Sequence, residues 1–158
     1  AAVAREVEPR STTSGFIAAG DAIAVLPVLI ESVDDLFLPD TLADRLSDLG
    51  LNIVQRIGLT KKLEARGVEL SVLLKSKEYP KLRDLGNVQK LALVASTLKE
   101  AGQVVKADCQ VLDLLGDKVV LRTVVGSDDD RQDASQSLEK TAREMAEAIN
   151  DSVDQAIS

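Results

Sequence analysis

The chain has 158 residues, a length typical of one domain, and its 45% hydrophobic and 28% charged residues are ordinary for a globular protein. It contains no His and no Trp, one Cys and 2% aromatic residues. The absence of His excludes His-ligated metal sites and every mechanism that uses an imidazole base. One Cys excludes an intrachain disulfide, a Cys-ligated zinc site and an iron–sulfur cluster. With so few aromatic rings, the composition favours a binding or assembly module over an enzyme.

The net charge of −7 is unevenly distributed along the chain. Residues 127–158 hold nine acids and three bases, whereas residues 1–126 hold 17 acids and 16 bases. Within the nearly neutral part, residues 56–90 carry nine bases against four acids. Such a separation of charge can steer an acidic partner, although solvated charges on exposed helices produce the same pattern. The acidic total and the scarcity of aromatic residues argue against nucleic acid as a partner.

Residues 1–20 are expected to form a flexible leader or tether, and residues 21–158 a single α/β domain. Residues 1–15 show no helical or strand period and contain Pro9 and a cluster of Ser, Thr and Gly. No apolar run reaches the ~20 residues that cross a bilayer as a helix. The sole methionine is Met145, so residue 1 is not an initiator, and we expect it to follow either a processing event or an artificial boundary. No signal peptide is visible in the sequence, and earlier removal of one is compatible with the first alternative.

The domain is predicted to open with a strand and a helix. The apolar run Ala22–Ile30 is typical of a buried strand, which Pro27 ends or distorts. A helix is expected from Thr41, with Asp40 as its N-cap and Gly50 as the left-handed residue that stops it.

A second strand and helix follow, over residues 51–56 and 59–66, and Gly67 stops the helix. The alternation of strand and helix predicts a βαβ unit with parallel strands. Residues 68–89 are harder to place, and we expect a short helix that breaks before Pro80.

The second half predicts an antiparallel meander and a long closing helix. Strands are expected over residues 91–99, 103–113 and 118–125, joined by glycine-containing turns. In the second of these strands, small apolar residues and Cys109 alternate with polar residues, so one face of the sheet is expected to be exposed to solvent. A helical apolar period over 131–157 completes the chain. The predicted fold class is α/β, an α+β mixed sheet in a β-α-β-α-(α)-β-β-β-α sandwich.

Few groups could carry chemistry, and each has a structural explanation. Asp128, Asp129 and Asp130 could bind a divalent cation, but they lack EF-hand spacing and precede a helix, whose dipole favours carboxylates there. Cys109 is expected to be a buried structural thiol, because no His is present to lower its pKa. The glycines form neither phosphate-binding motif. We therefore expect no catalytic residue, no metal and no cofactor.

Two surfaces remain as candidate sites. The surface nominated for a protein partner consists of four bases: Arg56, Lys61, Lys62 and Arg66. The alternative is a small ligand-binding or enzymatic α/β domain that uses only Asp, Glu, Lys and Arg groups, centred on Asp34, Asp35 and Arg56. A deep apolar pocket with convergent polar groups would favour the alternative, and a shallow surface would exclude it.

The order of motifs resembles that of the curli secretion channel family and its relatives, the penicillin-binding-protein activator lipoproteins. The run AIAVLPV followed by DTLADRLSDLGLNIVQR looks like the family's opening strand and helix, and Arg56 stands where the family pattern has Arg. The segment CQVLDLLGDKVVLRTVVG is similar to a later hairpin of the family, with Asp113, Gly116 and Val119 at matching places. These motifs lie within residues 22–157, and no lipidated Cys is present at the N-terminus.

The resemblance implies a non-enzymatic accessory module of the bacterial cell envelope, periplasmic and associated with the outer membrane. It would act by protein–protein contact, as an activator or assembly factor of a peptidoglycan synthase, a secretion complex or a flagellar outer-membrane complex. Membrane contact would come only through a lipid anchor that this sequence does not contain. If the acidic closing helix of one copy met the basic stretch of another, the head-to-tail contact would generate a homo-oligomeric ring or filament.

Overall fold

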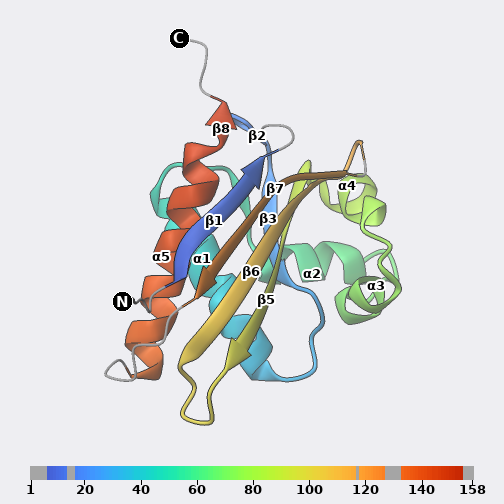
Figure 1. Cartoon of the computed structure of the whole chain (residues 1–158). Helices are drawn as coiled ribbons and strands as arrows, with labels where there is room; N and C mark the ends of the chain where they lie inside the picture. Colours follow the sequence, from blue (N-terminus) through green and yellow to red (C-terminus); the bar gives the residue numbers. More distant parts are fainter. Residues whose placement is uncertain (1–6, 14–16, 117, 127–132, 155–158) are drawn as a thin grey trace.

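The computed structural model describes residues 7–13, 17–116, 118–126 and 133–154 of the chain. Within these residues, six strands form one mixed sheet that carries helices on both faces (Figure 1). The strand order across the sheet is β1 (Val7–Thr13), β7 (Lys118–Gly126), β6 (Val104–Asp113), β5 (Lys90–Leu98), β3 (Ile23–Pro27) and β4 (Ile53–Val54). The mixed α/β class predicted from the sequence is confirmed.

The pairing of the strands confirms both predicted motifs. β3 runs parallel to β4 and to β5, as a βαβ opening requires. β5, β6 and β7 pair antiparallel in the predicted meander. The opening strand is shorter than the apolar run that predicted it, because it ends at Pro27, whose ring nitrogen has no proton to donate to a neighbouring strand.

The N-terminal segment differs from its prediction as a leader. β1 pairs antiparallel with β7, and β2 (Ile17–Ala18) pairs in parallel with β8 (Val153–Asp154) in a second small sheet. Ile17 is fully buried. An edge strand needs only backbone hydrogen bonds on one side, so β1 forms without the apolar alternation that signals a strand. β8 also shortens the closing helix, which was expected to continue to residue 157.

The first long helix, α1 (Phe37–Asp48), begins four residues before its predicted start and follows the short 3₁₀ helix η1 (Val33–Leu36). Pro39 lies in its first turn, where a missing backbone N–H breaks no hydrogen bond. Asp40 is therefore a first-turn residue rather than the N-cap. Gly50 has φ +90°, so its predicted role at the C-terminal end is confirmed.

Three short helices follow β4: α2 (Arg56–Glu64), α3 (Leu70–Ser76) and α4 (Pro80–Gly86). The sequence predicted one helix broken before Pro80, whereas Pro80 begins α4, because proline is well suited to the first turn of a helix. Lys77 and Asn87 end α3 and α4 in the left-handed region, at φ 58° and 57°.

The closing helix α5 (Ala134–Asp151) is capped by Asp133. The Asp133 carboxylate accepts a hydrogen bond from the Gln136 backbone at 2.8 Å, and the Gln136 side chain accepts one from the Asp133 backbone at 3.1 Å. This capping box fixes the start of the helix. The three aspartates predicted to stabilise that start, at 128–130, lie outside the described residues.

The sheet separates two hydrophobic clusters. On one face α1 and α5 pack against β3, β5, β6 and β7, and on the other α2, α3 and α4 cover the end of the sheet near β3 (Figure 1). Strand β5 contributes to both, with Ala92 and Val94 on the α1–α5 side and Leu91 and Leu93 on the other. No helix in the described part of the chain is both long and apolar enough to cross a membrane.

Candidate functional site

Arg56, the first of the four nominated bases, joins two helices. Its Nε and Nη2 atoms donate to the two carboxylate oxygens of Asp40 at 3.0 and 2.9 Å, so α1 and α2 are connected by a bidentate ion pair. The hydrogen bonding to Asp40 raises the pKa of Arg56, against partial burial, which lowers it. The guanidinium is thus engaged within the protein, which makes Arg56 a residue that positions α2.

The other three nominated bases are exposed on one side of the molecule. Lys61 and Lys62 lie on α2, and Arg66 lies in the turn after it. We call the exposed bases of α2, α3 and the adjoining turns the basic flank: Lys61, Lys62, Arg66, Lys75 and Lys77. Residues 56–86 hold eight bases and four acids, so this side carries net positive charge.

Helix α5 lies on the opposite side of the sheet from the basic flank (Figure 1). Its outer surface exposes Glu139, Arg143, Glu147 and Asp151. Glu139 forms an ion pair with Arg45 of α1, which leaves Glu147 and Asp151 at the C-terminal half of the helix. We call Glu147 and Asp151 the acidic flank. The structure therefore places a surface of net positive charge and a pair of acidic side chains on opposite sides of one molecule.

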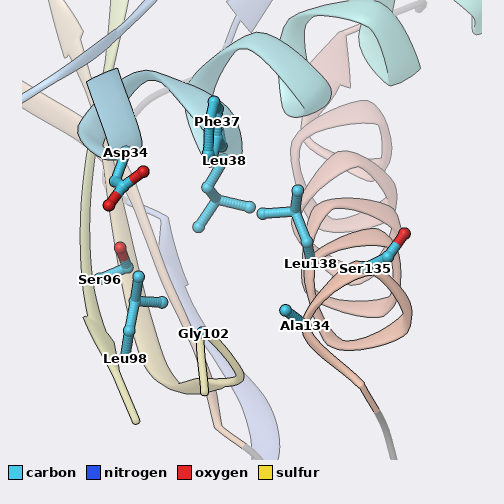
Figure 2. A pocket seen from close by; sticks show the side chains of 9 residues that line it. All are labelled: Asp34, Phe37, Leu38, Ser96, Leu98, Gly102, Ala134, Ser135 and Leu138. Carbon is cyan, nitrogen blue, oxygen red and sulfur yellow. The ribbon is translucent and has the colours of Figure 1, made fainter. Parts of the chain in front are cut away.

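A pocket of about 300 Å³ opens between η1 with the start of α1, the hairpin that joins β5 and β6, and the first turns of α5. Figure 2 shows its lining residues: Asp34, Phe37, Leu38, Ser96, Leu98, Gly102, Ala134, Ser135 and Leu138. The side chains of Leu38 and Leu138 point toward one another across it, and Asp34 and Ser96 form one wall. The pocket is an apolar slot with one carboxylate.

The pocket contains one of the three residues expected for an active site. Asp34 lines it, whereas the carboxylate of Asp35 accepts from the backbone N–H groups of Glu31 and Ser32 at 2.8 and 3.0 Å and so holds its own loop. Arg56 is bonded to Asp40. The three groups do not converge, and the expected constellation of Asp34, Asp35 and Arg56 is not present.

Two further expectations concern Cys109 and metal ions. Burial, together with the charge of Asp108, raises the pKa of Cys109 to about 12, which agrees with a structural thiol. No cluster of three or more Cys, Asp or Glu side chains able to hold a metal ion occurs among the described residues. The aspartates at 128–130 fall outside that region.

Sequence reasoning missed the apolar residues of the pocket. Phe37 stands in a polar stretch of sequence, and in the structure it is 51% exposed. An exposed aromatic residue marks a binding surface only as part of a larger apolar patch, so Phe37 alone was a weak signal. Leu98 and Leu138 gave no such signal. Each belongs to a segment with a clear strand or helix pattern, in which an apolar residue is expected.

No family model matches the sequence. No curated protein matches it either. Solved structures do match. A single-site variant of the PelC dodecamer from Paraburkholderia phytofirmans superposes with a TM-score of 0.57 at 15% identity, over 90% of this chain and 96% of that chain. Lipoprotein GNA1162 from Neisseria meningitidis superposes with a TM-score of 0.57 at 11% identity, over 88% of this chain and 99% of that chain.

The chain shares its fold with PelC and GNA1162. A PelC dodecamer in another crystal form matches with a TM-score of 0.50 at 15% identity. Each match covers nearly the whole of the solved chain and about nine-tenths of this one. At these identities the comparison establishes the fold.

Proposed function

We propose that the protein is a non-enzymatic accessory module of the bacterial cell envelope that acts through protein–protein contact and works as a homo-oligomer. The observation that carries the proposal is the shared fold over about nine-tenths of this chain. One of the matching proteins is a dodecamer and the other is a lipoprotein. Fold alone does not determine function, so the contact surfaces must be tested in this chain itself.

The opposite charges of the two flanks support the oligomer. Because the basic flank and the acidic flank lie on opposite sides of the sheet, they cannot meet within one molecule but can meet between copies. A contact between different surfaces of identical copies is heterologous, and it closes into a ring when the rotation between copies permits. Charge complementarity of this kind steers association and fixes orientation.

The same proposal assigns the place of action. We infer a periplasmic location associated with the outer membrane, with a lipid anchor outside the sequence, and an envelope protein as the external partner. The curli-channel and activator-lipoprotein superfamily, predicted from the sequence motifs, is the finer assignment that fits this role. The partner would belong to a peptidoglycan synthase, a secretion complex or a flagellar outer-membrane complex.

Paired charge reversals test the head-to-tail contact. One variant carries Lys61→Glu and Lys62→Glu, and the other carries Glu147→Lys and Asp151→Lys. Each variant alone brings like charges together at every contact, so sedimentation velocity should show monomers. An equimolar mixture places the acidic α2 of one variant against the basic α5 of the other, and the unmodified flanks still match. The mixture should therefore recover the wild-type sedimentation coefficient.

A matched control reverses charges that the proposed contact does not use. Lys106→Glu and Lys118→Glu change exposed lysines of β6 and β7, and they should leave the oligomer intact. A wild-type protein that sediments as a monomer at low salt would overturn the homo-oligomer. Variants that remain oligomeric, with no recovery on mixing, would overturn the contact between the flanks.

The pocket favours a second candidate function, a small ligand-binding domain. Small-molecule sites in proteins are concave and mostly apolar, with a few polar groups. The pocket has this form, with apolar walls and a single carboxylate. The polar groups do not converge there as chemistry on a substrate would require, so this candidate is binding rather than catalysis.

A further inference from the structure

The pocket beside η1 has walls that suit a short apolar group. Phe37, Leu38, Leu98 and Leu138 supply most of its surface. Its volume of about 300 Å³ is at the lower limit of small-molecule sites in proteins, so it holds a small ligand and not a long lipid chain.

The floor of the pocket depends on a glycine. Gly102 lies in the hairpin between β5 and β6 with φ +91°, and a Cβ atom at this position would lie 3.0 Å from the Cβ of Ala134. The hairpin therefore approaches the start of α5 closely, and the apolar side chains of two distant segments enclose one space. A larger residue at position 102 would therefore push the hairpin away from α5.

The charge in the pocket is a carboxylate without a partner. Asp34 makes no side-chain hydrogen bond or ion pair with any residue that the structure describes, whereas the neighbouring Asp35 is bonded to its own loop and Asp40 to Arg56. Asp34 and Ser96 both line the pocket, and Ser96 adds a hydroxyl to its polar groups (Figure 2). Both groups can accept hydrogen bonds from a donor inside the slot.

An aromatic ring accompanies this carboxylate. Phe37 lines the pocket and is 51% exposed, and Val33, one residue before Asp34, is 66% exposed. A carboxylate and an aromatic ring beside one apolar cavity are a combination that recognises an ammonium group attached to an apolar body. An anion would meet the unpaired charge of Asp34 and would be repelled.

We propose that this pocket binds a small amphipathic cation, an alkyl or aryl amine, with its apolar part between Leu38 and Leu138 and its ammonium group at Asp34. The site uses neither flank, so it is independent of the oligomer proposed above.

Titrations with three six-carbon probes test the proposal by heteronuclear NMR of the full chain. Hexylammonium should shift the backbone amides of residues 34–38, 96–102 and 134–138. Hexanol, which has the same tail without charge, should bind about threefold more weakly, since an exposed ion pair contributes modestly. Hexanoate should bind more weakly still.

Two variants separate charge from shape. Asp34→Asn should weaken hexylammonium about threefold, to the affinity of hexanol, and leave hexanol unchanged. Ser96→Leu places an apolar side chain in the slot and should abolish the binding of both probes, with the NMR spectrum confirming an intact fold. The control variant Asp44→Asn removes an exposed carboxylate of α1 that is not in the lining, and it should bind all probes as the wild type does.

Three results would overturn the proposal. Hexanoate could bind as tightly as hexylammonium, Asp34→Asn could leave the preference for the amine unchanged, or the shifts could spread over surfaces remote from the pocket. None of these results bears on the flanks, because the sedimentation experiments use different residues.

Discussion

Lys90 places a nearly buried ammonium group at the end of the sheet where β3 and β5 begin. Its Nζ atom donates to Asp21 at 2.8 Å and lies 3.6 Å from Asp113, and its side chain is 10% exposed. Asp21 also accepts from the backbone of Ala18 at 3.0 Å, and Asp113 accepts from the backbone of Leu115 at 3.2 Å. One cation thus holds three separate segments of the chain.

Replacing Lys90 by Met should lower the free energy of unfolding by about 2–3 kcal/mol, because it leaves two partly buried carboxylates without their cation. Urea denaturation measures the change. Lys81→Met removes an exposed lysine that pairs with Glu78 at 3.0 Å, and it should cost at most about 0.5 kcal/mol. Equal effects of the two substitutions would show that burial does not strengthen the Lys90 pair.

Cys109 gives the protein a pH dependence with a definite sign. Burial and the charge of Asp108 raise its folded pKa to about 12, whereas a free thiol ionises near pH ~8.5. Above that pH the unfolded state releases a proton that the folded state keeps, so stability falls as the pH rises toward 12. The contribution should be about 2 kcal/mol between pH ~8 and pH ~10, measured as the difference between wild type and Cys109→Ala.

The same thiol should resist a disulfide reagent near neutral pH until urea unfolds the chain, since only the thiolate attacks. Rapid labelling of the native protein, or a wild type whose pH dependence matches that of Cys109→Ala, would contradict the burial of this side chain.

At the scale of elements, the start of α5 depends on Asp133. Asp133→Ala removes the acceptor of the Gln136 N–H and should destabilise the protein by about 1 kcal/mol. Asp133→Asn keeps a capping oxygen and should retain most of the stability, as thermal unfolding can show. A loss as large in the Asn variant as in the Ala variant would indicate that charge, and not the cap, stabilises this end.

The elements that could be predicted are those with a period of their own. In β5, β6 and β7 the residues either alternate between apolar and polar or form apolar runs, and the apolar stripe of α5 repeats with a helical period. Local sequence was therefore sufficient to predict these elements. β1 and β8 could not be found because their partners lie at the other end of the chain. The helices α3 and α4 are each seven residues long, too short for a clear apolar stripe.

The candidate site also has a part that the sequence shows and a part that only the structure shows. Charge is visible in a sequence, and Lys61, Lys62 and Arg66 are exposed in the structure, whereas their contact with a partner stays a prediction. Whether a charge is already paired is not visible, and Arg56 was nominated although it bonds to Asp40. The pocket is formed by three segments that are distant in sequence and adjacent in space. The spacing of residues along the chain does not show that such segments are adjacent.

At the scale of the whole molecule, Ile17 joins the N-terminal part of the chain to the core. Ile17→Ala should lower the free energy of unfolding by about 3 kcal/mol, because the removed atoms leave a cavity among fully buried neighbours. Leu49→Ala is the control, since Leu49 is 47% exposed and should change stability by less than about 1 kcal/mol. If residues 1–20 were a leader, Ile17→Ala would leave the denaturation midpoint unchanged.

The pairing of β2 with β8 has a consequence for biosynthesis. Ile17 is made among the first residues of this chain and Val153 among the last, yet the two are direct neighbours in the small sheet. A growing chain can form the hairpins of β5, β6 and β7 as soon as they leave the ribosome, but β2 cannot pair until Val153 and Asp154 have been made. Contacts so distant in sequence form slowly. The backbone hydrogen-bonding groups of β2 therefore stay without their strand partner until β8 is available.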